Sequence, residues 1–336
     1  QSVTLSNLGT DTSLQLGSTG SALDDYSGTL TASLADETGT ADSLTIKMAN
    51  TDSNNDINAT LVTNAALETL TLQANAAAGT TDDVTLDVTG VKSGTIALTK
   101  GVATEALILG TLSATTTAVD ASAFDGLLSV TASATGTEIT VKTGNVANTI
   151  AGAAGDDTLT IATLASDDAD GAGGTDTLNA TIKVSQTEAT TLFENVNYTI
   201  GDSVQVTVTG GNGVGVDDAT NFKLLGGNAL TTYVGDFVSP ASLVSIDMSG
   251  YAGKSTALTF AASQLLGSMD IVGSAGADTI VASTAAAVKS MTGVETLTLN
   301  AVGALAFDFS KTTGVTTVKT DDDGTTYVGA WKDDKA

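Results

Sequence analysis

The amino-acid sequence predicts an all-β fold of many short strands, arranged in β-sandwich or β-solenoid-like stacks, with little helix. Three observations carry this prediction. Apolar and polar residues alternate with a period of two along much of the chain, which places the apolar side chains on one face of each strand. The alternating segments are rich in Thr, Val and Ile, whose branched side chains suit a pleated sheet. Gly, Asn and Asp separate these segments at short intervals, as turns between strands do.

The strand prediction is strongest where apolar residues alternate with Thr or a charged residue. The clearest such segments are residues 43–48, 69–72, 84–88 and 204–208. Helical periodicity is weak in comparison, and the two best candidates, residues 257–266 and 285–291, have room for only two or three turns of helix each. Strands are therefore expected to dominate the structure.

The composition excludes several classes of protein. The 336 residues include 38 Asp and Glu against 12 Lys and Arg, a formal net charge of −26, and all 12 cationic residues are lysine. Such a chain repels the phosphate backbone, so nucleic acid is not an expected partner. Cys and His are absent. A disulfide framework, a thiol nucleophile, a Cys or His zinc site and a Ser-His-Asp triad are therefore excluded.

The apolar content is sufficient for a substantial core. Hydrophobic residues make up 41% of the chain but aromatic residues only 4%, so the core is expected to consist of aliphatic side chains and Thr methyl groups. Thr, Ser, Asn or Asp interrupts every apolar stretch before it reaches the length of a membrane-spanning helix, so no transmembrane segment is expected. The chain begins at Gln1 without a signal-like segment, which we interpret as a mature product or an internal fragment.

Two short elements recur in the same order along the chain. One places an acidic residue before a strand, and the other reads apolar-Asp-x-Ser. The first occurs at Glu68, Glu194 and Glu295, and the second at Asp120, Asp247 and Asp308. From the first copy to the second, the numbering shifts by 194 − 68 = 126 for one element and by 247 − 120 = 127 for the other. This agreement indicates an imperfect duplication with a shortened third copy, although Thr-rich and Ala-rich strands also resemble one another by composition alone.

The repeats predict three domains. The first is a β-rich domain at residues 1–148. The second, at residues 149–272, is a β-rich domain with two Gly-Asp loops. The third, at residues 273–336, is a shortened β repeat. These boundaries place one further Gly-Asp loop at the start of the last domain.

Three nonapeptides contain the residues with the clearest potential to bind a metal ion. They read GAAGDDTLT from Gly152, GAGGTDTLN from Gly171 and GSAGADTIV from Gly273. Each fits the calcium-binding form G-G-x-G-x-D-x-U-x except at the second glycine. Glycine permits positive φ, which turns backbone carbonyls inward, and the Asp at the sixth position adds a carboxylate. Hard cations such as Ca²⁺ prefer these oxygen ligands. The apolar residue two positions later, which is Leu159, Leu178 or Ile280, is expected to begin an anchoring strand.

The candidate metal ligands follow from these loops. They are the aspartates Asp157, Asp176 and Asp278, the neighbouring Asp156, and the glycines Gly152, Gly155, Gly171, Gly173, Gly174, Gly273 and Gly276. Asp168 and Asp170 lie between the first two loops and are expected to complete a shell with Asp157 and Asp176. The start of one loop is separated from the start of the next by 171 − 152 = 19 in the numbering, which favours single calcium loops at the edge of a strand stack over a continuous roll. The alternative is that these are ordinary Gly-Asp turns.

The order of these elements resembles a known family. Residues 152–200 join two Gly-Asp nonapeptides to a strand at 177–182 and to the Phe-Glu-Asn-Val segment at 193–196. GSAGADTIV similarly leads to Gly-Val-Glu-Thr-Leu at 293–297, and residues 119–124 resemble a repeated element of the same group. The resemblance is to RTX-related, calcium-dependent surface-layer (S-layer) proteins that Gram-negative bacteria secrete by the type I route. It covers the C-terminal two thirds of the chain, and only Asp157, Asp176 and Asp278 with their glycines match the motif residue by residue.

The resemblance implies a secreted structural protein of the bacterial cell surface. Such a protein binds Ca²⁺ and self-assembles as a homo-oligomer into a layer or filament, with cell-surface polysaccharide as a further partner. A calcium-dependent adhesin or extracellular binding module is the alternative, although its ligand pocket would need aromatic side chains, and those at Tyr233, Phe237, Tyr251 and Trp331 suit core or edge packing. An enzyme is not expected, because no pair of acidic residues stands out from the turns.

Overall fold

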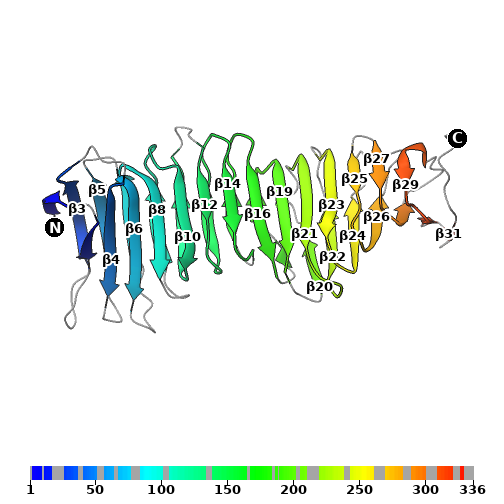
Figure 1. Cartoon of the computed structure of the whole chain (residues 1–336), viewed down its shortest axis with the longest axis horizontal. Coiled ribbons are helices and arrows are strands. Elements are labelled where there is room, and N and C mark those ends of the chain that lie inside the picture. The colour runs from blue at the N-terminus through cyan, green and yellow to red at the C-terminus, as the bar shows by residue number, and fades with distance from the viewer. Residues whose placement is uncertain are drawn as a thin grey trace. The chain divides into compact units, whose positions relative to one another are not determined.

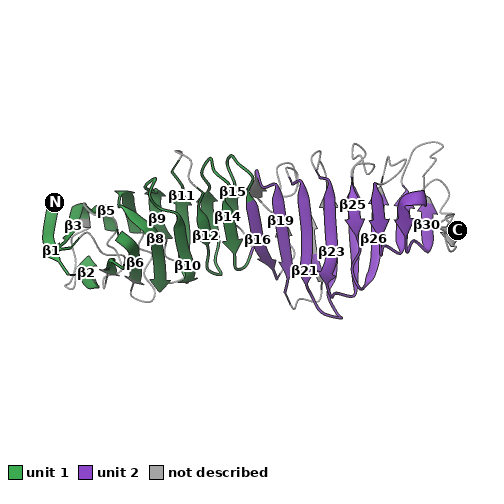
Figure 2. Ribbon diagram, turned by 45° about the horizontal axis from the view of Figure 1, so that its top comes forward, with its two compact units in different colours: residues 1–163, 167–176 green, residues 164–166, 177–336 purple. Residues whose placement is uncertain are grey.

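The structure is a computed structural model of the chain (Figure 1). It describes residues 2–9, 11–16, 26–36, 41–50, 57–63, 67–76, 84–100, 106–133, 138–164, 167–183, 186–187, 189–201, 205–209, 219–237, 243–260, 269–282, 289–299, 309–320 and 326–328. The chain divides into two compact units, coloured separately in Figure 2. Unit 1 comprises residues 1–163 and 167–176, and unit 2 comprises residues 164–166 and 177–336.

Unit 1 is a β-solenoid made of two parallel sheets. Consecutive strands alternate between the sheets, so that each pair of strands completes one turn of the chain. One sheet contains β1 (Ser2–Leu8), β3 (Tyr26–Leu34), β5 (Ile57–Thr63), β7 (Val84–Gly90), β9 (Ala106–Thr111), β11 (Leu127–Thr131), β13 (Asn148–Ala151) and β15 (Asp168–Asp170), in that spatial order. The other contains β2 (Thr12–Leu16), β4 (Ser43–Asn50), β6 (Leu67–Ala76), β8 (Ser93–Lys100), β10 (Ala118–Phe124), β12 (Thr140–Lys142) and β14 (Thr158–Ile161).

Unit 2 repeats this architecture. One sheet contains β16 (Thr177–Ile182), β19 (Asn195–Ile200), β21 (Asn221–Gly226), β23 (Ser245–Tyr251), β25 (Asp270–Val272), β27 (Ser290–Thr292) and β29 (Thr312–Thr313). The other contains β17 (Gln186–Thr187), β20 (Gln205–Thr209), β22 (Thr232–Phe237), β24 (Ser255–Phe260), β26 (Ala277–Ala282), β28 (Thr296–Leu299), β30 (Thr317–Thr320) and β31 (Thr326–Val328). The unit also contains β18 (Ala189–Thr191). The β30–β31 pair is antiparallel, whereas the other pairings described within the units are parallel.

Alternation along the strands fills the space between the two sheets. In β16 and β24 every second side chain is buried and the intervening ones are partly exposed. Leu159, Leu178 and Ile280, the predicted anchors of the nonapeptides, are fully buried. Burying an aliphatic side chain contributes about 1.5–3 kcal/mol, so these anchors hold their corners firmly to the core. The predicted all-β fold is therefore confirmed, and of the two arrangements expected, the solenoid is the one formed.

The two segments with the best helical periodicity contain strands where the structure describes them, in keeping with the expected dominance of strands. Residues 257–260 belong to β24 and residues 290–291 to β27, while 261–266 and 285–288 lie outside the described residues. The helical element described is a single turn of 3₁₀-helix, Phe309–Lys311. Residues 257–260 continue the period-two alternation of β24, which prevails over a helical pattern too short to stabilise itself.

The two compact units differ from the three predicted domains at 1–148, 149–272 and 273–336. The first predicted boundary falls inside β13, which pairs with β11 and β15. The second falls inside unit 2, where β23 pairs with β25 and β24 pairs with β26 on either side of residue 272. A repeat in a solenoid buries its apolar face against its neighbours, so a repeat boundary in the sequence does not produce a break in the fold.

The length of one turn varies along unit 1. Ser43 is paired with Thr69, an offset of 69 − 43 = 26, whereas Thr140 is paired with Thr158, an offset of only 158 − 140 = 18. The short turn contains the first nonapeptide, whose small residues make a tight corner. Within unit 1, the shortest turn therefore coincides with the first nonapeptide.

Candidate functional site

The first two nonapeptides are stacked on each other in consecutive turns. The Gly152 N–H donates to the Asp170 carbonyl (2.8 Å), and the Gly173 N–H donates to the Ala153 carbonyl (3.2 Å). The Thr175 N–H donates to Oδ1 of Asp156 (2.9 Å). The interval between the starts of the two loops is therefore one turn of the chain, whereas the sequence predicted separate loops.

Asp157 is a buried link between turns. Its side chain is 1% exposed. Oδ1 accepts a hydrogen bond from the Ile139 N–H (2.8 Å), and Oδ2 accepts one from the Ala153 N–H (2.5 Å). The Asp157 N–H donates to Oδ1 of the equally buried Asp176 (2.7 Å). Burial raises the pKa of Asp157, and the nearby charges of Asp156 and Glu138 add to that effect, while the two N–H donors oppose it.

The third nonapeptide forms the same arrangement in unit 2. Asp278 is 1% exposed, and its Oδ1 accepts hydrogen bonds from the hydroxyls of Thr256 (2.6 Å) and Ser274 (2.8 Å). Its Oδ2 accepts one from the Ser274 N–H (2.5 Å). The Asp278 N–H donates to Oε2 of Glu295 (2.8 Å). Ser274 stands where the motif has its second glycine, and its hydroxyl gives the carboxylate an additional donor.

The glycines of the motif allow neighbouring turns to approach closely. A Cβ on Gly152 would lie 2.5 Å from the Gly171 carbonyl oxygen, and one on Gly273 would lie 1.9 Å from the Gly293 carbonyl oxygen. Gly174 has a positive φ of 142°, and its Cβ would lie 2.4 Å from the Gly155 oxygen. A Cβ on Gly276 would clash with the Gly253 and Lys254 carbonyls at 2.5 and 2.6 Å. Gly173 is different, because a Cβ there would meet no atom within 4 Å.

The remaining predicted ligands are spread over the corner. Asp168 is exposed on β15, Oδ1 of Asp170 accepts the Ala172 N–H (2.9 Å), and Asp156 is exposed. Over the described ranges, no group of three or more acidic side chains lies close enough to hold a metal ion. The structure thus brings Asp157 and Asp176 together but does not gather Asp168 and Asp170 with them. Since a carboxylate offers about four lone-pair sites, Asp157 and Asp278 keep acceptor capacity beyond their protein donors.

A fourth corner of this kind was not predicted. The Asp42 N–H donates to Oε2 of Glu68 (2.6 Å), as the Asp278 N–H does to Glu295. Asp42 lies in no nonapeptide, so the motif could not identify it. The signal that was present in the sequence is the recurring acidic residue before a strand at Glu68 and Glu295. The structure gives this repeat a physical role, because both glutamates accept an N–H from the preceding turn.

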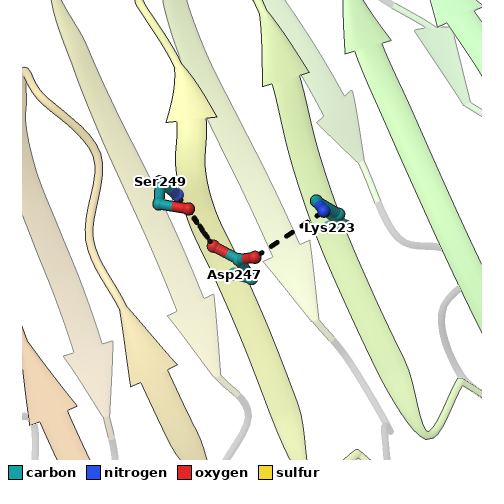
Figure 3. A network of polar contacts seen from close by, with 3 residues as sticks. All are labelled: Lys223, Asp247 and Ser249. Carbon is teal, nitrogen blue, oxygen red and sulfur yellow. Dashed lines mark hydrogen bonds and ion pairs between the residues drawn. The ribbon is translucent and has the colours of Figure 1, made fainter.

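The second recurring element, apolar-Asp-x-Ser, is a β-bulge. Oδ1 of Asp247 accepts the Ser249 hydroxyl (2.6 Å) and N–H (3.0 Å), and Lys223 lies 3.9 Å from Oδ2 (Figure 3). Three residues of β23 oppose two of β21 at this point. The Ser249 hydroxyl, its N–H and Lys223 lower the pKa of Asp247 despite partial burial.

Two further copies of this bulge are present in unit 1. Oδ1 of Asp120 accepts the hydroxyl (2.6 Å) and N–H (3.1 Å) of Ser122 in β10. Asp87 does the same for Thr89 in β7, a copy that the pattern missed because it carries Thr in place of Ser. Asp308 lies outside the described residues. The element is therefore a local device for adding one residue to a strand.

Comparison with known proteins adds no relative: no family model, no curated protein and no solved structure matches the chain. In the described part of the structure, no helix has the length and apolar character needed to cross a membrane. Tyr233 and Tyr251 are core residues, each 1% exposed, as the sequence predicted. Trp331 and the side chain of Phe237 lie outside what the structure describes.

Proposed function

We propose that this chain is a secreted structural protein of the bacterial cell surface, which self-assembles into a calcium-stabilised layer or filament. One observation carries the proposal. Acidic residues of successive turns meet at the corners, where the backbone N–H of one donates to the carboxylate of the other: Asp157 to Asp176, Asp278 to Glu295, and Asp42 to Glu68. Like charges held together in a partly desolvated place repel one another, and a divalent cation relieves that repulsion.

Calcium would act on the fold by linkage. In this proposal Asp157, Asp176 and Asp278 bind Ca²⁺ together with carbonyl oxygens of their loops, and the ion binds the folded state alone. Each site then adds about 2.7 kcal/mol when free calcium is 100 times the Kd. At low cytosolic calcium the anionic corners weaken the fold and favour export. At the higher calcium concentration outside the cell the turns close and the chain becomes a rigid subunit.

The β-solenoid architecture supports a structural role. Stacked turns give each unit a continuous core and a repeating outer surface, which suits an element that bears load and joins copies of itself. The test is removal of calcium. Chelation should lower the melting temperature and disperse layers or fibres seen by negative-stain microscopy, and re-addition should restore both. The proposal would be refuted if the chelator changed neither the melting temperature nor the assembly state.

A calcium-dependent adhesin is the second candidate, and one observation favours it. The outer face of unit 2 carries paired amides: Asn197 donates to Asn179 (3.0 Å), and Asn221 donates to Asn195 (3.0 Å), across β16, β19 and β21. Rows of amides can bind the hydroxyl groups of a cell-surface polysaccharide. Dispersed monomers that bind polysaccharide in calcium would favour this function, whereas ordered arrays without polysaccharide favour self-assembly.

A further inference from the structure

Asp42 differs from Asp157 and Asp278, the aspartates in the same position at the two corners that its own corner resembles. At all three the backbone N–H of an Asp donates to a carboxylate of the next turn. At Asp157 and Asp278 both oxygens of that Asp accept hydrogen bonds from N–H or hydroxyl groups. Asp42 is 3% exposed, yet its buried Oδ2 has no hydrogen-bonding partner among the described residues.

An oxygen in this position has a cost that the fold does not offset. Burying a carboxylate oxygen without a donor costs more than burying a neutral polar atom in the same way. Burial raises the pKa of Asp42, and the nearby carboxylates of Glu68 and Asp36 raise it further. The surrounding charges therefore increase the cost of burying this carboxylate. Three acidic residues, Asp36, Asp42 and Glu68, therefore lie near the start of β4, and the buried Oδ2 of Asp42 has no hydrogen-bond donor among the described residues.

Glu68 strengthens the inference. Its Oε2 accepts the Asp42 N–H at 2.6 Å, and the Asp42 carbonyl accepts the N–H groups of Glu68 (3.1 Å) and Thr69 (3.2 Å). These three bonds fix the Glu68 carboxylate beside the backbone of Asp42, at the point where β4 begins next to β6. A carboxylate that backbone bonds already hold beside a second acidic residue is prepared to receive a cation with little further ordering of the chain.

We propose that the Asp42–Glu68 corner is a binding site for a divalent cation of the Ca²⁺ class, with Oδ2 of Asp42 and the Glu68 carboxylate as its protein ligands. Asp36 contributes negative charge to the site. Ca²⁺ takes six to eight oxygen ligands, and two carboxylates leave most positions to water. Few protein ligands give weak sites, so the expected Kd is about 10⁻³ M, in the range of extracellular modules. The site lies outside the nonapeptides, and a single chain carries all of it.

Hydrogen exchange read by mass spectrometry tests this site separately from every other. The dispersed, full-length chain is labelled in chelator and in about 10 mM CaCl₂, and the peptides covering residues 41–50 and 67–76 are followed. With a Kd near 10⁻³ M, calcium should slow their exchange about tenfold, because binding reduces the open state by 1 + [L]/Kd. Asp42→Asn and Glu68→Gln should each lose most of that response, since both variants keep the shape of the side chain and remove its charge.

Asp120→Asn is the matched control, since it removes a carboxylate of unit 1 that accepts hydrogen bonds from Ser122 within β10 and lies in none of the proposed calcium sites. It should leave the calcium response of residues 41–50 and 67–76 unchanged. NaCl at matched ionic strength should not reproduce that response. The proposal is overturned if the wild-type peptides ignore calcium, if NaCl protects them equally, or if Asp42→Asn responds as the wild type does. None of these outcomes bears on assembly, which is measured by microscopy.

Discussion

The glycine that opens the first nonapeptide should be intolerant of even one added carbon. In Gly152→Ala the new Cβ would lie 2.5 Å from the Gly171 carbonyl oxygen and 2.6 Å from Oδ2 of Asp157. The Gly171 oxygen belongs to the backbone of the next turn, which is held there by the bond from Gly152 N–H to Asp170. Relief therefore requires the two turns to separate, and overpacking of this kind costs about 1–3 kcal/mol. Displacement of Asp157 from the Ala153 N–H adds to that cost.

Gly173→Ala is the control, because its Cβ would meet no atom within 4 Å and its φ is not positive. Alanine there should leave stability unchanged or raise it by up to about 1 kcal/mol through the entropy of the unfolded chain. Guanidinium unfolding followed by far-UV circular dichroism gives both free energies. If Gly152→Ala unfolds within about 0.5 kcal/mol of Gly173→Ala, which is the usual scatter of neutral substitutions, the close contact between turns is refuted.

Two other predictions concern unit 2. Phe222 is 1% exposed, its ring centroid is 5.5 Å from that of Tyr198 and 6.3 Å from that of Tyr233, and Phe222→Ala should cost about 3–5 kcal/mol. Val272→Ala, at a site 39% exposed, should change stability by less than about 0.5 kcal/mol, and equal melting temperatures for the two variants would contradict the packing. Asp247 has a lowered pKa in the fold, so its ionised form contributes stability above the ordinary value of 3.8, and this is lost as pH falls through the lowered pKa. Asp247→Asn should therefore be less stable than the wild type at pH 7, with a difference that shrinks as the pH is taken below 3.8; a constant difference would contradict the assignment.

The fold class could be predicted because it depends on local alternation. Every second residue of β16 and β24 is buried, and this period is visible in the sequence. The closure of the strands into parallel turns was not visible, since the same alternation suits a sandwich. The information that decides between them is the register between residues a full turn apart, as for Thr140 with Thr158 and Ser43 with Thr69. No local pattern encodes that pairing.

The sequence identified residues of the candidate site, but it did not reveal the contacts that these residues make. The motif identified Asp157, Asp176 and Asp278, and all three are buried at corners. It did not reveal that the backbone N–H of Ile139, in the preceding turn, would bond to Asp157. Nor did it identify Asp42, whose position becomes informative only when its bond to Glu68 is known. Contacts between turns join residues far apart in sequence, and a short nonapeptide pattern cannot contain them.

Hydrogen bonding alone does not explain why the side chains at these corners are charged. A neutral side chain can accept the same kind of bond, because the Lys92 N–H donates to the Thr63 hydroxyl (2.9 Å) and the Asn228 N–H to the Thr231 hydroxyl (2.9 Å). Threonine is abundant in this chain, yet Asp and Glu stand at Asp42, Glu68, Asp157, Asp278 and Glu295. A carboxylate gives a stronger bond than a hydroxyl, but it brings repulsion in a molecule with a net charge of −26. Under the calcium linkage proposed above, charged corners make the closure of each turn respond to cations and neutral corners do not, so carboxylates at these corners suit that proposal.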